Sequence, residues 1–358
     1  MKHIIFVVFT FLSSQLWAQT LRQGEFLKPS EGAAELNAFL ADYPTRALWE
    51  SKRSLILKGI LEGSGLKTIE IIKPKVISLS TKKKAEGYSV QNIKIKSLNG
   101  FFVSGNLYIP SNINGKIPAV LCPHGHFEDG RLQEYMQQRC ATLARMGAIV
   151  FAYDMVGYGD ALYADHKADS TLKLQLQNSI SALNYLWYHP NVNRNKIGIT
   201  GESGGGTQTF LLAAIDSRIA VSVPTVMVSS HFFGGCTCES GLPIHQRASY
   251  TTNNAEIAAC MAPKPQLLIS NGSDWTKFNP DVELPYLQKV YGLYSQKNKV
   301  TNVHLALEQH DYGYSKRVAM YQFMAKYLGL NLQKVMKNGQ VNEKINTIYD
   351  KEELSVKI

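Results

Sequence analysis

The chain has 358 residues, of which 45% are hydrophobic and 18% charged, so it can bury a sizeable core and is not a disordered chain. The net charge of +10 comes from dispersed basic residues, and the sequence shows no basic motif interleaved with aromatics, so we expect no nucleic-acid partner. Such a surface can attract an anionic polysaccharide, and it can equally be a solvated surface without a partner.

Residues 1–18 have the pattern of a secretory signal peptide. Lys2 gives a basic start, residues 4–12 are apolar, and the small residue Ala18 stands where cleavage is expected. The apolar run is shorter than the roughly 20 residues that span a bilayer, which favours a cleaved signal over the alternative of an uncleaved anchor. We therefore expect an exported protein, periplasmic or extracellular, with no stable membrane insertion after the signal is removed.

Residues 19–75 are predicted to form an N-terminal helical extension, because apolar side chains recur at helical spacing over 30–66. The domain over 76–330 begins with a hairpin at Asn99-Gly100, a dipeptide typical of tight β-turns, and continues with strands that alternate with helices. This alternation predicts an α/β fold with a mostly parallel central sheet and helices on both faces. The expected strands are 88–97, 101–109, 118–122, 148–153, 196–200, 219–228, 266–270 and 303–307, and the expected helices are 133–146, 172–188, 204–215, 282–294 and 316–328.

Residues 229–262 interrupt the alternation and show no clear periodicity. A long irregular segment inside a compact domain is usually functional, so we interpret it as a cap-like insertion over a pocket. It contains Cys236 and Cys238, two of five cysteines, and export would permit a disulfide whose pairing the sequence does not decide. Residues 331–358 form a polar C-terminal tail.

The run from Gly201 through Ser203 to Gly205 is a G-x-S-x-G motif between a predicted strand and a predicted helix. In that context the glycines permit a sharp, strained turn that presents the serine hydroxyl as a nucleophile. The acid and the base are expected later in the chain, in that order. Asp274 and His310 each follow a predicted strand and fit these roles.

His310 would then take the proton of Ser203, and Asp274 would orient the imidazole. Glu239, Asp281 and Asp311 are rival acids, although Asp311 is too close to His310 in sequence to reach its ring easily.

An oxyanion hole needs two N–H donors, which we assign to the backbone of Gly204 and of His126. His126 follows a predicted strand together with His124, and a His-x-His pair also suggests a metal site. Because Asp129 is the only further ligand nearby in sequence, we predict no metal and no cofactor.

Several short motifs fall on these predicted strand ends and loops: Pro123-His-Gly-His126, Phe151-Ala-Tyr-Asp-Met-Val-Gly-Tyr-Gly159, Gly201-Glu-Ser-Gly-Gly205, Gly235-Cys-Thr-Cys-Glu239, Asp274-Trp-Thr276 and His310-Asp-Tyr-Gly313. Together they resemble exported bacterial α/β-hydrolases related to acetyl xylan esterases, over about 38–328. The resemblance implies the α/β-hydrolase fold and hydrolysis of carbohydrate esters, acetyl or methyl, with the family's serine, acid and base at Ser203, Asp274 and His310. The Gly-Cys-x-Cys-Glu element departs from ordinary acetyl xylan esterases, and we expect it to shape the pocket.

The sequence therefore predicts a serine esterase that removes acetyl or methyl esters from plant cell-wall polysaccharides through an acyl-serine intermediate. Trp275, Phe232 and Tyr312 are candidate pocket walls, with ordinary packing as the alternative for each. A peptidase of the prolyl-oligopeptidase kind is a second hypothesis, although the segment before the domain is too short for a propeller. A carbohydrate-binding protein without activity is a third.

Overall fold

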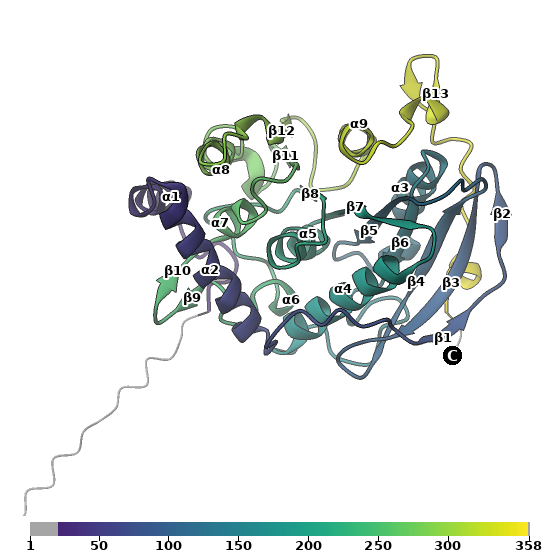
Figure 1. Ribbon diagram of the computed structural model, residues 1–358, viewed down its shortest axis with the longest axis horizontal. Helices are drawn as coiled ribbons and strands as arrows, with labels where there is room; N and C mark the ends of the chain where they lie inside the picture. The colour runs from purple at the N-terminus through teal and green to yellow at the C-terminus, as the bar shows by residue number, and fades with distance from the viewer. Residues whose placement is uncertain (1–20, 357–358) are drawn as a thin grey trace, which may run out of the picture.

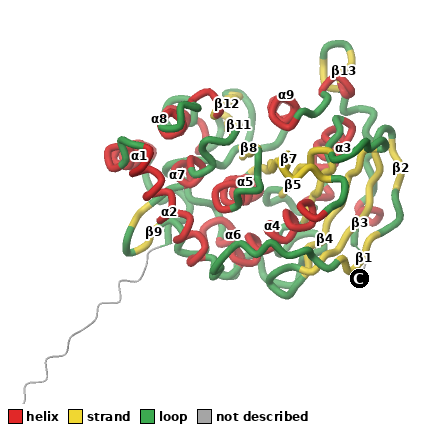
Figure 2. Tube along the Cα trace, viewed as in Figure 1, coloured by secondary structure: helices red, strands yellow, loops and turns green. Residues whose placement is uncertain are grey.

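The computed structural model describes residues 21–356 (Figures 1 and 2). The predicted signal peptide, residues 1–18, lies outside the described residues. Within the described part of the chain, no helix has the length and apolar character needed to cross a membrane. The centre of the fold is a ten-stranded sheet in the order β1-β3-β4-β6-β5-β7-β8-β11-β12, with β2 paired to β3. Its strands are β1 Val76–Leu79, β2 Lys83–Ala85, β3 Tyr88–Lys96, β4 Phe102–Pro110, β5 Ile117–Pro123, β6 Ile149–Tyr153, β7 Val192–Glu202, β8 Val221–Thr225, β11 Gln266–Asn271 and β12 Val300–Leu305.

The sheet is parallel from β6 to β12 and antiparallel at its other edge, as the alternation of strands and helices predicts. The predicted hairpin is β3 and β4, paired from Tyr88 with Pro110 to Lys96 with Phe102. Gly100 has φ of 87° in the connecting turn, a conformation that a residue with a Cβ adopts rarely. The short strands β1 and β2 extend this edge, and the sequence pattern did not reveal them.

Helices cover both faces of the sheet, with α3 and α9 on one side and α4 and α5 on the other (Figure 1). Successive residues of β5 show why both faces are buried. Ala119 and Leu121 belong to the core under α4 and α5, whereas Val120 and Cys122 belong to the core under α3 and α9. Predicted and observed helices agree to within a few residues: α3 is Glu134–Arg145, α4 Thr171–Tyr188, α5 Gly204–Ile215, α8 Glu283–Gly292 and α9 Tyr314–Leu328.

Two helices, α1 (Pro29–Asp42) and α2 (Arg46–Gly63), form the predicted N-terminal extension and pack on α8 and α5. Trp49 is fully buried, and its ring lies 5.0 Å from that of Tyr43. The extension is therefore part of the main hydrophobic core and not a separate unit.

The insertion over 229–262 is folded into the domain as four short elements: α6 Thr237–Ser240, β9 Gln246–Arg247, β10 Tyr250–Thr251 and α7 Asn254–Ala259. The polar tail also packs on the domain. Leu354 is fully buried, and its carbonyl accepts a hydrogen bond from Asn106 Nδ2 (2.9 Å) in β4. Arg317 and Glu343 form an ion pair at 2.5 Å that joins α9 to the tail. The remaining short elements are η1 Gly130–Leu132, η2 Trp275–Phe278, η3 Lys297–Lys299, η4 Leu332–Val335, β13 Met336–Lys337, β14 Gln340–Val341 and α10 Lys351–Leu354.

Candidate active site

Ser203 stands in the sharp turn between β7 and α5, with φ of 51° and ψ of −123°. A positive φ is unusual for a residue with a side chain, and here it turns the partly exposed serine out of the strand. Close backbone contacts explain the flanking glycines. A Cβ on Gly201 would lie 2.6 Å from the carbonyl oxygen of Gly205, and one on Gly205 would lie 2.8 Å from those of Pro123 and His124.

Asp274 and His310 are in direct contact: His310 Nδ1 donates a hydrogen bond to Asp274 Oδ2 at 2.6 Å. Asp274 Oδ1 also accepts bonds from the backbone and the hydroxyl of Thr276, at 2.7 and 2.6 Å. Burial alone would raise the pKa of Asp274, but the bonds from His310 and Thr276 outweigh it and hold the pKa below its ordinary value. Asp274 is therefore anionic near neutral pH and suited to orient the imidazole.

The three predicted residues follow three parallel strands at the same edge of the sheet. Ser203 follows β7, Asp274 follows β11 and His310 follows β12. This is the edge at which ligands bind in open α/β sheets. Within the described residues, the Ser203 hydroxyl has no hydrogen bond to a side chain; catalytic bonds of this kind often tighten only when substrate is bound.

The rival acids have other surroundings. Asp311 forms an ion pair with Lys316 at 2.6 Å, and Glu239 accepts a bond from the backbone of Gly235 at 2.6 Å. Asp281 is exposed. Of these carboxylates, Asp274 is the one with a hydrogen bond to His310.

The loop after β5 lies against the nucleophile, as an oxyanion loop must. A Cβ on Gly125 would lie 3.3 Å from Ser203 Cβ, and one on Gly204 would lie 2.7 Å from His126 Cε1. The predicted donors, the backbone N–H groups of Gly204 and His126, thus belong to segments in contact with each other.

Glu202, which directly precedes Ser203, holds this loop in place through a hydrogen bond. Its buried carboxylate accepts bonds from Gly125 N (3.0 Å), Arg139 (2.8 Å) and the Tyr135 hydroxyl. Sequence reasoning missed this positioning role of Glu202 and Arg139. The buried pair is separated by 63 residues, and no local pattern points from one to the other.

One of the three candidate wall residues, Trp275, lies beside His310, and a second, Phe232, stacks on Trp275. The rings of Phe232 and Trp275 are stacked with centroids 3.6 Å apart, and Trp275 lies 4.9 Å from the imidazole of His310. Tyr312 is buried instead, with its hydroxyl 2.6 Å from Thr200 Oγ1 and Arg139 over its ring. Tyr312 therefore has the surroundings of a packed core residue, the alternative considered for it, and not those of a pocket wall.

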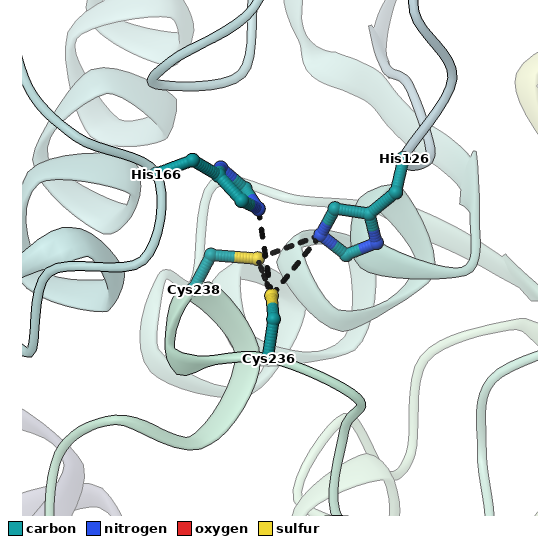
Figure 3. A group of neighbouring side chains, drawn as sticks. All are labelled: His126, His166, Cys236 and Cys238. Carbon is teal, nitrogen blue, oxygen red and sulfur yellow. Dashed lines mark hydrogen bonds between the residues drawn. The ribbon is translucent and has the colours of Figure 1, made fainter.

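The two histidines after β5 have different environments. His124 is fully buried and both of its ring nitrogens bond to backbone: Nδ1 donates to Gly125 O at 2.7 Å, and Nε2 accepts from Met155 N at 2.9 Å. Burial lowers the pKa of His124 to about 4, so the ring is neutral. Asp129, the ligand considered with this pair, forms an ion pair with Lys351 at 2.6 Å. His126 faces Cys236, Cys238 and His166, as Figure 3 shows.

The fold matches that of a methylesterase. The chain is 37% identical to the methylesterase BT1017 and superposes on it with a TM-score of 0.84. The match covers 92% of this chain and 74% of the methylesterase. This chain belongs to the family of that methylesterase. A putative acetyl xylan esterase from Bacteroides fragilis, at 17% identity and a TM-score of 0.57 over 73% of this chain and 76% of that one, shares the fold. A glucuronoyl esterase from Solibacter usitatus also shares the fold. It is 14% identical and has a TM-score of 0.58, and the match covers 78% of this chain and 93% of that one.

Two more distant matches carry descriptions of hydrolases. Residues 176–258 match the model of the BAAT / acyl-CoA thioester hydrolase C-terminal domain. A putative hydrolase, YtaP, from Bacillus subtilis is 28% identical over 186 residues, 44% of this chain. The chain spans 60% of the length of that relative, and 37% of an uncharacterized protein of Pseudomonas aeruginosa. Taken together, the matches identify an ester hydrolase with the α/β-hydrolase fold.

Proposed function

We propose that the protein is a serine esterase that removes methyl or acetyl esters from plant cell-wall polysaccharides through an acyl-Ser203 intermediate. The observation that carries the proposal is the 2.6 Å bond from His310 to Asp274, on the same sheet edge as the strained Ser203 turn. An oriented imidazole and a partly exposed hydroxyl at that edge are the parts that acyl transfer requires.

In this mechanism the Ser203 hydroxyl attacks the ester carbonyl and His310 takes its proton. The oxygen that becomes negative is stabilised by the backbone N–H groups of Gly204 and His126. His310 then gives the proton to the leaving alcohol, which departs and leaves the acyl group on Ser203. Water, deprotonated by His310, releases the acid and restores the serine.

The two ester classes differ in which part of the sugar stays on the enzyme. From a methyl ester of a uronic acid, methanol leaves and the sugar acid is bound to Ser203. From an acetyl ester, the sugar hydroxyl leaves and the acetyl group is bound. The relation to a methylesterase supports the methyl class. The signal-like pattern of residues 1–18 supports action outside the cytoplasm, where such polymers are found.

The test measures methanol released from methylated pectin and acetate released from acetylated xylan, side by side. Each substrate is given to the parent protein, to Ser203→Ala and to Ser217→Ala. Ser217 is an exposed serine that lies away from the site, so its variant controls for the loss of a hydroxyl. We expect methanol release that Ser217→Ala retains and Ser203→Ala loses. A larger acetate yield would assign the acetyl class.

Equal turnover by the parent and Ser203→Ala would refute the serine mechanism. Binding of both polymers without any product would favour the carbohydrate-binding alternative. Cleavage of a dipeptide amide in preference to either ester would favour the peptidase. Labelling with a fluorophosphonate, followed by peptide mapping, identifies the reactive serine without the natural substrate.

A further inference from the structure

Four side chains with metal-ligating atoms meet beside the candidate active site (Figure 3). Cys236 Sγ lies 3.2 Å from His126 Nε2, 3.5 Å from His166 Nε2 and 2.8 Å from Cys238 Sγ. Cys238 Sγ lies 2.9 Å from His126 Nε2. All four ligand atoms lie within 4.8 Å of one another. They come from three segments: His126 follows β5, His166 precedes α4, and the two cysteines stand at the start of α6 in the 229–262 insertion.

We propose that these four residues bind one divalent zinc ion. Two thiolates and two imidazoles are a common donor set of structural zinc sites, and zinc prefers four such ligands in a tetrahedron. The proposal rests on these residues alone and does not depend on the serine mechanism or on the ester class.

The second ring nitrogen of His166 supports the proposal independently. His166 Nδ1 donates a hydrogen bond to the carbonyl of Val156 at 2.7 Å. This bond leaves the lone pair of Nε2 directed at the cluster, and metal-ligating histidines almost always have such an outer partner. The ring is further enclosed by Tyr158, with centroids 4.8 Å apart. His124 shows the contrast, because both of its nitrogens already bond to backbone.

A disulfide between Cys236 and Cys238 is the competing interpretation. Their sulfurs lie 2.8 Å apart, beyond the roughly 2.05 Å of a disulfide bond, and both thiols are free. A disulfide would also leave the lone pair of His166 Nε2 facing a sulfur atom that has no proton to donate. An ion uses all four groups at once.

The ion would have a positioning role. Its four protein ligands fill a tetrahedral shell, which is typical of structural sites and not of catalytic ones. The ring of His126 lies against the backbone of Gly204, next to Ser203. The ion would thus tie the insertion and the loop before α4 to the loop that carries the predicted oxyanion donor.

The first measurement is the metal content of the purified full chain, which we expect to be close to one zinc per chain. Cys236→Ser and Cys238→Ser should each reduce the content at least tenfold. Cys260→Ala, which changes a buried cysteine outside the cluster, should retain it, and so should Ser203→Ala. Replacement of zinc by cobalt should give the visible bands of a tetrahedral ion with thiolate ligands.

A parent protein that stays metal-free after reduction and exposure to zinc would overturn the proposal. So would equal metal content in the parent and the Cys236 variant, or an intact mass lower by two hydrogens with Cys236 and Cys238 joined. If a cysteine variant does not fold, the cobalt spectrum of the parent still decides, since cobalt bound at a site without cysteine gives no sulfur-to-cobalt charge-transfer band, and Cys122→Ala/Cys260→Ala should retain the band of the parent.

Discussion

His310 and Asp274 are joined by a 2.6 Å hydrogen bond although 36 residues separate them in the chain. The parallel pairing of β11 with β12 brings them together, because the two residues follow the ends of adjacent strands. The backbone carbonyl of Gln309 also accepts a bond from Asn271 (2.8 Å), and Asn271 in turn donates to Asp274 (2.9 Å). The sheet therefore sets the geometry of this pair before any substrate is present.

Asp274→Asn should lower kcat by about 10⁴-fold, because an amide there favours the wrong imidazole tautomer. KM should change little, since the substitution keeps the shape of the side chain. Asp281→Asn, at an exposed rival acid, is the matched control and should behave like the parent. Steady-state kinetics on one ester substrate measures both values. A large loss in the Asp281 variant with normal activity in the Asp274 variant would reassign the acid.

Gly205→Ala should destabilise the nucleophile turn by about 1–3 kcal/mol, the usual cost of overpacking. The new Cβ would meet two backbone carbonyls at 2.8 Å, and backbone cannot move aside as a flexible side chain can. Gly292→Ala is the control, because its Cβ would meet nothing within 4 Å, and it should be neutral or stabilising by about 0.5–1 kcal/mol. Urea unfolding and fluorophosphonate labelling of Ser203 report on the two variants. Equal stability and labelling would contradict the steric argument.

The fold could be predicted in outline because the alternating pattern of its strands and helices is local. Each of the residues Ser203, Asp274 and His310 also carries a local signal, a glycine motif or a strand end. Three members of the four-residue cluster lie in short motifs, but no local signal joins those motifs or points to His166, which lies in an irregular loop and meets Cys236 only through tertiary folding, 70 residues away. The burial of Leu354 against β4 could not be predicted either, because no periodic pattern in the polar tail indicates it.

The contribution of Glu256 to the free energy of unfolding should fall as pH rises from about 4.5 to about 7. Burial raises the pKa of Glu256 to about 7, whereas the pKa of this side chain in the unfolded chain is 4.5. The charge of Lys52 and hydrogen bonds from Thr252 and Tyr43 lower the pKa, but burial outweighs them. Between these values the folded chain holds a proton that the unfolded chain has lost. The stabilisation that Glu256 provides below pH 4.5 is therefore lost as the pH rises through 7. The loss is roughly 3 kcal/mol, because each unit of pKa difference corresponds to about 1.4 kcal/mol.

Glu256→Gln, which cannot ionise, isolates this effect. Its stability relative to the parent should increase between pH 5 and pH 8, as measured by urea unfolding at both values. Asp311→Asn is a control with a lowered pKa and an exposed carboxylate, and it should not reproduce that trend over this range. A constant difference between parent and Glu256→Gln would contradict the raised pKa.

The basic charge of the chain predicts faster reaction with anionic polymers at low salt. kcat/KM on partly de-esterified pectin should fall as ionic strength rises from 0.01 to 0.15 M, because the screening length shortens from about 30 to about 8 Å. A neutral acetyl ester of a small alcohol is the control and should be insensitive to salt. If the anionic polymer is equally insensitive, the charge belongs to a solvated surface without a partner.

Glu202→Gln should cost about 3–5 kcal/mol of stability, because it leaves the buried Arg139 charge without its partner. It should also lower kcat more than it raises KM, since Glu202 holds the backbone of Gly125 at 3.0 Å beside Ser203. The double variant Glu202→Leu/Arg139→Leu separates these effects. Removing both charges should restore much of the stability while kcat stays low, because the loop remains without its carboxylate anchor. If the double variant regains full activity, the anchoring role is wrong and the pair acts through stability alone.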